Sequence, residues 1–389
     1  MKLLVITTNF PRWEGDPHSP WLVELLGLLR KEGVRADVLA PAYRGQGDHT
    51  VHGMRVRRFR YAPARWETLT HEEGAPNKIR VNPLYLLLLP AYVLSGLLAA
   101  WRMGRAGRYD VVHVHWPVPG ALFGLVARWA GGGRLVLTFF GAELMLARRF
   151  PFVAPFLRFV THRCDAVVAI SAFAGSEVAR MTGVQPQIIP FGVAVPPEST
   201  RPQPPEPGLV LTVGRLIARK GHVYLVEAMA GLRDHPSAHL VIVGEGHERP
   251  NLEATIRRLG LADRVVLAGR VSDQELNRLY QACQVFVLPA IVDPGGDTEM
   301  LGMVLLEAMR YGKPVVCTRV GGTSDIVRDG ENGLLLPEKD PAALSEAISR
   351  LLDDPGLAAR LGQAGYATAR DDFGWPEIVR RTKAVYGMA

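Results

Sequence analysis

The amino-acid sequence predicts an α/β protein of two doubly wound domains, each built on a parallel β-sheet. The first observation is length, because 389 residues exceed the roughly 250–300 at which a single core stops growing. The second is an alternation of strand-like and helix-like segments, and the third is a proline-rich stretch near the middle of the chain. With 48% hydrophobic and 21% charged residues, the composition is that of a globular protein and excludes wholesale disorder.

Short apolar, β-branched runs alternate with helix-length segments in both halves of the chain. The runs are KLLVITT, RADVLAP, VVHVH, RLVLTFF and AVVAI in the first half, and LVLTVG, HLVIVG, RVVLAG, VFVLP and PVVCT in the second. Strands that are apolar almost throughout are typical of parallel sheets covered by helices on both faces. Two Rossmann-like domains are therefore expected.

Residues 193–208, VAVPPESTRPQPPEPG, mark the boundary between the domains. Six prolines in these sixteen residues suit a semi-rigid linker better than a strand or a helix. We therefore predict an N-terminal domain over residues 1–192 and a C-terminal domain over residues 209–371. Residues 372–389 form a separate C-terminal helical segment.

The apolar segments and the cysteines indicate in which cellular compartment the protein is expected. The N-terminal run is too short for a signal peptide, and the apolar stretch Leu84–Trp101 is interrupted by Pro90, which favours a pair of helices over a membrane span. The three cysteines are widely separated and form no C-x-x-C pair, which argues against a disulfide framework or a zinc site. A reducing cytoplasm is expected.

The net charge of +7 is concentrated in the N-terminal half. No recognised nucleic-acid module accompanies it, so a nucleic-acid partner is not expected. Solvated faces would explain the arginines as well as an anionic membrane surface or an anionic acceptor would. The arginines form two groups, Arg55, Arg57, Arg58, Arg60 and Arg65, and then Arg102, Arg105 and Arg108 after the apolar stretch.

Ligands of open α/β sheets bind beyond the carboxyl ends of the strands, so two facing domains place the site in the cleft between them. After the strand LVLTV, the segment GRLIARKG brings Arg215 and Lys220 to such an end, and the two cations imply an anion. The spacing is not that of a P-loop. Gly244 ends HLVIVG and begins G-E-G, a turn that lacks the third glycine of a dinucleotide fingerprint. No G-x-G-x-x-G follows the first strand KLLVITT either, so NAD is disfavoured.

The strongest signal is VDPGGDTEMLGMVLLEAMRYGKPVV. A glycine- and proline-rich loop delivers Glu299, and a helix beginning near Leu301 holds Glu307 in its second turn. At 1.5 Å rise per residue the two carboxylates lie roughly 10 Å apart, with the helix N-terminus near them. A nucleoside diphosphate sugar has matching parts, because its sugar and ribose hydroxyls donate to carboxylates and its diphosphate suits a helix N-terminus and cations.

With these motifs, the chain resembles family 4 of the retaining glycosyltransferases, which have the GT-B fold. The match covers nearly the whole chain, and its elements are E-x(7)-E with Gly302 inside it, VGRL…KG, GRVSDQELNRLYQACQVFVLP and VGGTSDIVRDGENGLLL. The resemblance implies that the C-terminal helix returns to the N-terminal domain. It also implies donor contacts: Arg215 and Lys220 hold the diphosphate, Glu299 the sugar, Glu307 the ribose, the backbone around Arg270 and Val271 the base, and amides near Met303 assist.

The N-terminal half departs from the family pattern. Gly15, in Gly-Asp-Pro-His, is the best candidate for the glycine pair that many members have after the first strand. Phe140 stands where many members have a histidine that touches the donor sugar or the acceptor. We expect His115 or Glu143 to supply that polar contact, and His113 to face the other side of its strand.

These features predict a cytoplasmic enzyme, which could work at the inner face of the membrane. It moves a hexose-type sugar from a UDP- or GDP-sugar to a hydroxyl of a glycan or lipid-linked acceptor, with retention and no cofactor. The sequence contains no D-x-D, so a metal-free reaction is expected. Peripheral contact with an anionic membrane, through the basic N-terminal domain, is a further hypothesis. The alternatives are a nucleotide-sugar 2-epimerase of the same fold and a non-catalytic protein that binds a membrane surface.

Overall fold

The computed structural model describes residues 1–16, 18–71, 75–196 and 204–388, and these form two compact units. The chain passes from unit 1 to unit 2 between Ile189 and Pro190, slightly before the boundary predicted at residue 192. Residues 197–203 of the predicted linker lie outside the described residues. The chain rejoins unit 1 at Val379, within the last helix, which confirms the predicted return of the C-terminal helix.

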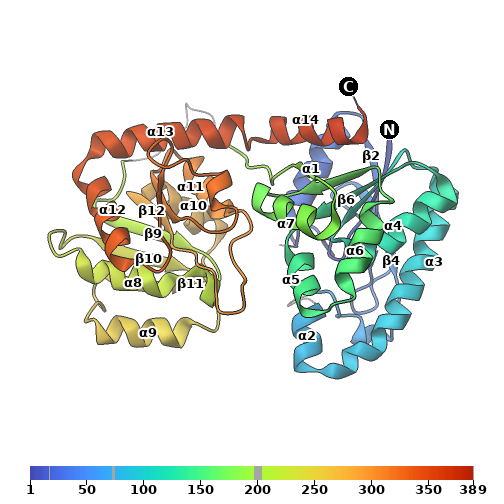
Figure 1. Ribbon diagram of the computed structural model, residues 1–389, viewed down its shortest axis with the longest axis horizontal. Helices are drawn as coiled ribbons and strands as arrows, with labels where there is room; N and C mark the ends of the chain where they lie inside the picture. The colour runs from blue at the N-terminus through green and yellow to red at the C-terminus, as the bar shows by residue number, and fades with distance from the viewer. Residues whose placement is uncertain (17, 72–74, 197–203, 389) are drawn as a thin grey trace. The chain divides into compact units, whose positions relative to one another are not determined.

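Unit 1, which carries both chain ends in Figure 1, is built on an eight-stranded sheet in the order β3-β4-β2-β1-β5-β6-β7-β8. All neighbouring strands are parallel except β3 and β4. Its strands are β1 (Lys2–Ile6), β2 (Arg35–Pro41), β3 (His49–Val51), β4 (Met54–Phe59), β5 (Val111–His115), β6 (Arg134–Phe139), β7 (Ala166–Ala169) and β8 (Gln187–Ile188). Its helices are α1 (Pro20–Lys31), η1 (Ala64–Trp66), α2 (Ala75–Val81), η2 (Pro83–Leu88), α3 (Leu89–Gly107), α4 (Pro117–Gly131), α5 (Ala142–Arg149), α6 (Val153–Thr161) and α7 (Ala172–Thr182).

Unit 2 is built on a six-stranded parallel sheet in the order β11-β10-β9-β12-β13-β14, which is the strand order of the Rossmann fold. Its strands are β9 (Leu209–Val213), β10 (His239–Val243), β11 (Val265–Gly269), β12 (Val285–Leu288), β13 (Val315–Thr318) and β14 (Leu334–Leu336). Its helices are η3 (Ala218–Lys220), α8 (His222–Gly231), α9 (Arg249–Arg258), α10 (Asp273–Ala282), α11 (Met303–Met309), η4 (Thr323–Asp325), α12 (Pro341–Asp353), α13 (Pro355–Asp371) and the start of α14 (Trp375–Tyr386).

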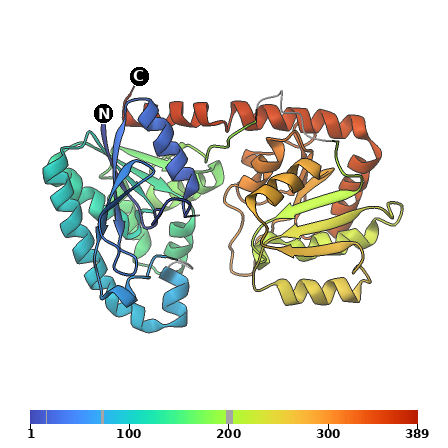
Figure 2. The same ribbon diagram turned by 180° about the vertical axis from the view of Figure 1, so that it is seen from behind.

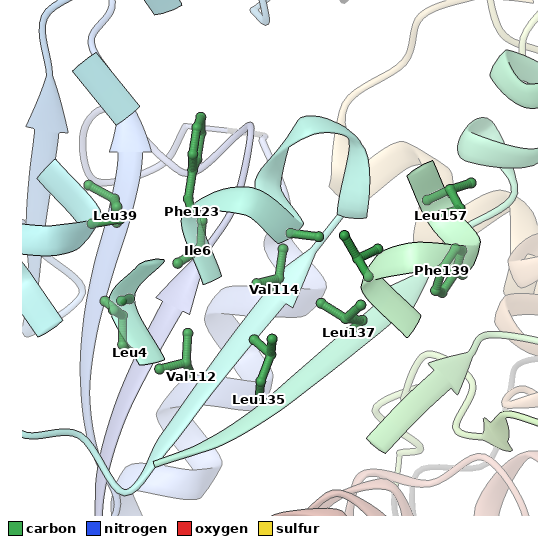
Figure 3. Packing of buried hydrophobic residues seen from close by; sticks show 14 of the residues in the cluster. Leu4, Ile6, Leu39, Val112, Val114, Phe123, Leu135, Leu137, Phe139 and Leu157 are labelled. Atoms are coloured by element: carbon green, nitrogen blue, oxygen red, sulfur yellow. The ribbon is translucent and has the colours of Figure 1, made fainter. Parts of the chain in front are cut away.

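Both faces of the unit 1 sheet are apolar and covered by helices. Alternate residues of β1, β5 and β6 point to one face and form one apolar cluster with Phe123 of α4. Figure 3 shows Leu4, Val112 and Leu135 side by side in this cluster. The intervening residues point to the other face, on which α1 lies toward the viewer in Figure 2. Because both faces are buried, the strands read as continuous apolar runs, as the sequence predicted.

Strand β4 was missed in the sequence because it does not follow this rule. Its sequence MRVRRF buries Met54 and Val56 and exposes Arg55 and Arg57 between them. This alternation is typical of a strand with one solvated face, so β4 contains no continuous apolar run that would predict it. The short strands β3, β8 and β14 were missed as well.

The apolar stretch forms two helices, as expected, but they follow each other without a break: the 3-10 helix η2 ends at Leu88 and α3 begins at Leu89. Pro90 lies in the first turn of α3. The N–H groups of a first helical turn have no partner within the helix, so a proline there removes no hydrogen bond and does not break the helix. Of the described helices, Pro83–Gly107 has the length and apolar composition needed to cross a membrane, and 17% of its most apolar window is buried. Gly96 lies against Phe123 and Gly104 against Ala127 of α4, so the two helices run close together (Figure 1).

The strand order determines where ligands are expected. In each sheet the order reverses once, between β1 and β5 in unit 1 and between β9 and β12 in unit 2. Parallel α/β sheets bind ligands outside the carboxyl ends of the strands at such a point. The loops after β1, β9 and β12 contain Gly15, Arg215, Lys220 and Glu299, four of the residues singled out in the sequence.

Candidate active site

The loop after β9 positions the first group of predicted donor residues. Arg215 is exposed, and its guanidinium forms no hydrogen bond or ion pair with the described residues. Lys220 ends the short helix η3 and is buried. Gly221, at φ 65°, follows it with its backbone so close to Pro289 that an added Cβ would lie 1.9 Å from the carbonyl oxygen. This close approach brings Lys220 beside the loop that follows β12.

Glu299, in the loop after β12, is held by two cations. Its Oε2 accepts hydrogen bonds from Lys220 Nζ at 2.5 Å and from Arg219 Nη1 at 3.3 Å. The side chain is 11% exposed. Burial by itself raises the pKa of this carboxyl, but Lys220 and Arg219 outweigh it and the net pKa is lowered. Glu299 is therefore ionised at neutral pH.

The glycine pair of the VGGTSD motif fixes the backbone at Glu299. Gly321, at φ 54°, lies so close that an added Cβ would be 1.8 Å from the Glu299 carbonyl oxygen. The Gly322 N–H donates to that same oxygen at 2.9 Å, and Arg219 donates to the carbonyl of Thr298 at 3.1 Å. The motif thus acts on the site through the main chain.

Glu307 lies at the other end of this segment. Gly302, at φ 96°, precedes α11, which begins at Met303 and so starts slightly later than the predicted Leu301. Glu307 is in the second turn, as predicted, and its Oε2 accepts a hydrogen bond from the Tyr280 hydroxyl at 2.7 Å. Burial raises the pKa of Glu307, and the bond from Tyr280 partly opposes this.

The remaining predicted donor residues lie at neighbouring strand ends. Gly244 follows β10 with its backbone against Gly214, where an added Cβ would be 1.9 Å from the carbonyl oxygen. Arg270 and Val271 follow β11, the first exposed and the second half-buried. In unit 1, Gly15 is exposed at φ 83°, and an added Cβ there would meet no atom within 4 Å. The base and diphosphate contacts of these residues stay predictions.

His115 and Phe140 belong to an aromatic cluster at the carboxyl ends of β5 and β6. The His115 ring lies 5.4 Å from Trp21 and 5.8 Å from Phe140, and Phe140 stacks on Trp116 at 4.5 Å. His115 is 2% exposed, and its Nδ1 has no hydrogen-bond partner in the described structure. Burial holds its pKa well below the ordinary value, so the imidazole is neutral.

The expectation that His113 faces away from His115 is wrong. The two rings lie 4.1 Å apart, because residues two apart in a strand project from the same face. The His113 ring nitrogens pair with the Tyr386 hydroxyl of α14 and the Thr138 hydroxyl, each at 2.7 Å. His113 therefore helps to dock the returning C-terminal helix on unit 1.

Glu143 closes the loop before α5. Its Oε2 accepts from the N–H groups of Phe140 at 3.2 Å and of Gly141 at 3.0 Å, while its buried Oε1 has no partner among the described residues. Burial raises the pKa to about 7. The geometry gives this carboxylate a part in capping the helix. A contact with a substrate stays a prediction.

The first arginine group is largely neutralised within the protein. Carboxylates of Asp37, Asp48 and Glu67 form ion pairs with Arg55, Arg57 and Arg60 respectively. Arg58 is buried and donates to main-chain carbonyls. These residues therefore offer little free charge to a membrane.

Comparison with known proteins agrees with this geometry. The model "Glycosyl transferases group 1" matches residues 198–368, and the model "Glycosyltransferase Family 4" matches residues 21–195. A GDP-mannose-dependent alpha-(1-6)-phosphatidylinositol monomannoside mannosyltransferase of Mycolicibacterium smegmatis is 32% identical over 96% of this chain and 95% of its own length. The chain belongs to glycosyltransferase family 4.

Other relatives of this family 4 chain extend the comparison. A D-inositol 3-phosphate glycosyltransferase of Acidothermus cellulolyticus is 34% identical, over 94% of this chain and 84% of its own. The fold matches sucrose-phosphate synthase of Thermosynechococcus elongatus with a TM-score of 0.76 at 24% identity, over 100% and 98% of the two chains. HepE of Anabaena in complex with UDP matches with a TM-score of 0.74 at 20% identity, over the whole of both chains. The fold is thus GT-B, and the protein is a glycosyltransferase.

Two residues of this family 4 site were missed in the sequence. Arg219 precedes Lys220 in ARKG and contacts both Glu299 and Asp297. Tyr280 lies within LYQACQ and orients Glu307. Both contacts join segments far apart in the chain, so no local pattern could have indicated them.

Proposed function

We propose that this enzyme transfers a hexose-type sugar from a GDP- or UDP-sugar to a hydroxyl of a glycan or lipid-linked acceptor. The observation that carries the proposal is the pair of buried carboxylates around the start of α11, Glu299 with two cations and Glu307 with Tyr280. Its mycobacterial relative is named as GDP-mannose-dependent, and HepE is described in complex with UDP. Both classes of donor therefore belong in the test.

The charges suggest how the donor is held. An ammonium has three N–H donors, and Glu299 engages one from Lys220, so two remain for phosphate oxygens. The exposed Arg215 supplies a second cation. When the bond between the anomeric carbon and the phosphate oxygen breaks, its electron pair leaves with the phosphate. Fixed cations stabilise that developing charge, which supports a reaction without a metal.

We also propose that the configuration at the anomeric carbon is retained. The acceptor hydroxyl then forms its bond on the face from which the phosphate leaves, and the departing phosphate takes its proton. Glu299 accepts hydrogen bonds from the sugar hydroxyls and orients the ring. NMR of the product anomer tests retention, and activity that EDTA leaves unchanged is the expected result for metal independence.

A donor panel tests the transferase function. We expect one GDP- or UDP-sugar to raise the melting temperature and to release nucleotide in the presence of acceptor. Glu299→Gln should lower turnover by at least roughly 100-fold, the scale of losing one group that acts on the transition state. An epimerase would instead release nucleotide without acceptor and form a 2-epimer. A binding protein would show stabilisation without turnover, and either result would overturn the proposal.

We further propose a cytoplasmic location, with contact to an anionic membrane surface through α3 and the segment before it. Leu87 is 74% exposed and Leu94 66%, and residues 75–109 contain no Asp or Glu but include Arg102, Arg105 and Arg108. These arginines form no ion pair with the described residues, and exposed apolar side chains beside such cations suit an anionic lipid interface.

Vesicle sedimentation tests the membrane contact. Leu87→Ser with Leu94→Ser should reduce binding to anionic vesicles. The control is Val266→Ser in unit 2, where the side chain is 52% exposed, and this change should leave binding unaltered. Equal binding by all three proteins would rule the surface out.

A further inference from the structure

Trp13 is a large apolar side chain in the loop that follows β1, and the residue is 52% exposed. β1 is one of the two strands between which the strand order of unit 1 reverses. Loops that follow such strands carry the ligand contacts of parallel α/β sheets. Single exposed apolar residues are common, so a function for this one depends on how the ring is held and on what surrounds it.

The Trp13 ring packs on a buried arginine. The Arg12 guanidinium carbon lies 4.3 Å from the centre of the Trp13 ring and 4.4 Å from that of Tyr43, in the loop after β2. The buried Asp16 carboxylate accepts two hydrogen bonds from this guanidinium, from Nε at 2.7 Å and from Nη2 at 3.0 Å. The ion pair fixes the plane of the guanidinium, and the cation–π contact then restricts the positions of the indole.

The backbone on the N-terminal side of Trp13 is fixed as well. The Arg58 guanidinium donates to the Pro11 carbonyl at 2.7 Å, and the Gln46 side-chain amide donates to the Arg12 carbonyl at 2.5 Å. Trp13 is therefore an exposed ring on a rigid support. Binding to a side chain that is already ordered loses little conformational entropy, which is the property of an anchor residue in a binding site.

The surroundings of Trp13 favour a sugar ring as its ligand. A pyranose has a face of C–H groups, which packs on an indole, and a rim of hydroxyls, which donate hydrogen bonds. The neighbouring Glu14 carboxylate is 69% exposed, and it holds the His52 N–H at 2.7 Å and the His52 Nδ1 at 2.8 Å. A carboxylate has about four acceptor sites, so Glu14 keeps capacity for sugar hydroxyls. Its exposed negative charge also opposes contact with an anionic membrane.

Trp13 lies to one side of the point of reversal. Through Arg12 its ring stack leads toward β2, whereas the aromatic cluster of His115 and Phe140 lies at the ends of β5 and β6, across β1. β2 and β6 are separated by three strand spacings, roughly 14 Å, which is wider than one pyranose ring. A ligand that contacts both places therefore has more than one ring.

We propose that Trp13 and Glu14 form an outer sugar subsite, in which the indole stacks on a pyranose unit of the acceptor other than the unit with the accepting hydroxyl. The inference rests on the proposed transferase function. It adds a requirement that this function does not contain, namely an acceptor of two or more sugar units. Trp13 thus selects the length of the acceptor and takes no part in the transfer step.

Titration with oligosaccharides of increasing length tests the subsite. With saturating GDP or UDP, the mono-, di- and trisaccharides of mannose, glucose, galactose and N-acetylglucosamine are titrated by calorimetry. In at least one series we expect the di- or trisaccharide to bind roughly 10-fold more tightly than the monosaccharide, the scale of one buried aromatic contact. Trp13→Ala should remove this difference and Trp13→Phe should keep part of it. The control is Trp129→Ala on α4, where the residue is 82% exposed, and it should leave the difference unchanged.

The outcomes separate this subsite from the alternatives. The subsite would be overturned if no series gained affinity with length, or if Trp13→Ala kept the gain. Failure of turnover with every acceptor would instead overturn the transferase function, since the titrations measure binding alone. Sedimentation with phosphatidylglycerol vesicles tests a lipid contact, and a loss of vesicle binding in Trp13→Ala would assign the indole to the membrane and overturn the proposal.

Discussion

Removing one hydroxyl from Tyr280 is expected to weaken binding of the nucleotide ribose. Tyr280 is fully buried, and its hydroxyl donates to Glu307 Oε2 at 2.7 Å. A hydrogen bond to a charged group contributes about 1.5–3 kcal/mol, or roughly 10- to 100-fold in Kd. Because Tyr280→Phe keeps the ring and frees the carboxylate to rotate, this value is the upper limit of the loss in affinity.

Calorimetry with ribo- and 2′-deoxyribonucleoside diphosphates isolates the effect. If Glu307 holds the ribose diol, the variant should lose affinity for the ribonucleotide and much less for the deoxy form. Tyr311→Phe is the matched control, because its hydroxyl lies 3.1 Å from Asn277 and its ring lies 6.5 Å from that of Tyr280. Equal weakening of both nucleotides, or no weakening, would refute the role of Tyr280.

The pH dependence gives a second signature of Tyr280→Phe. Burial raises the pKa of Glu307 and the Tyr280 bond lowers it, so removing the bond raises the pKa further. Affinity that needs the ionised carboxylate is present above this pKa and is lost as the pH falls through it. The loss should therefore begin at a higher pH in the variant than in the wild type, as calorimetry across a pH series would show.

Three further predictions concern the scaffold around the sites. Gly321→Ala should lower the stability of the fold by more than the about 1–2 kcal/mol that a left-handed alanine costs, and it should lower turnover, because the added Cβ would clash with the Glu299 carbonyl. Thermal unfolding and activity assays measure both effects. The control is Gly330→Ala, where φ is 71° and an added Cβ meets no atom within 4 Å. Asp16→Asn should destabilise unit 1 by about 3–5 kcal/mol at neutral pH, the cost of breaking a buried ion pair. Burial raises the Asp16 pKa, but hydrogen bonds from Arg12 and then His18 outweigh it, so the net pKa is lowered. The ion pair therefore stabilises the folded state above the unfolded pKa of about 3.9. In urea unfolding, the difference in free energy of unfolding between variant and wild type should shrink as the pH falls below that value. Burial raises the pKa of Glu143 to about 7, so between about pH 4.3 and 7 the folded state binds a proton that the unfolded state lacks, and the free energy of unfolding falls as the pH rises through this window. Glu143→Gln should make the free energy of unfolding less dependent on pH there. An unchanged pH dependence would mean that Glu143 does not titrate in this window.

The fold was largely predictable because its evidence is local. Strands buried on both faces are apolar runs, and ten such runs located the core strands of both sheets. The exceptions follow from the same physics: β4 has one solvated face, and Pro90 begins a helix that it was expected to interrupt. Glu299 and Glu307 were also found, since the loop and helix that carry them are one continuous segment.

Short-range patterns in the sequence predict the fold, the family and the position of two carboxylates, Glu299 and Glu307, around the start of α11. The tertiary structure decided which groups act together. Arg219 and Tyr280 reach Glu299 and Glu307 from segments some 80 and 27 residues away, and the His113 ring lies beside that of His115. The sequence left open whether the arginines of β4 form a solvated face or serve an anionic surface, and in the structure they are taken up by ion pairs or buried. Such contacts depend on which distant segments meet in the fold, and this cannot be predicted from the type and local spacing of a residue.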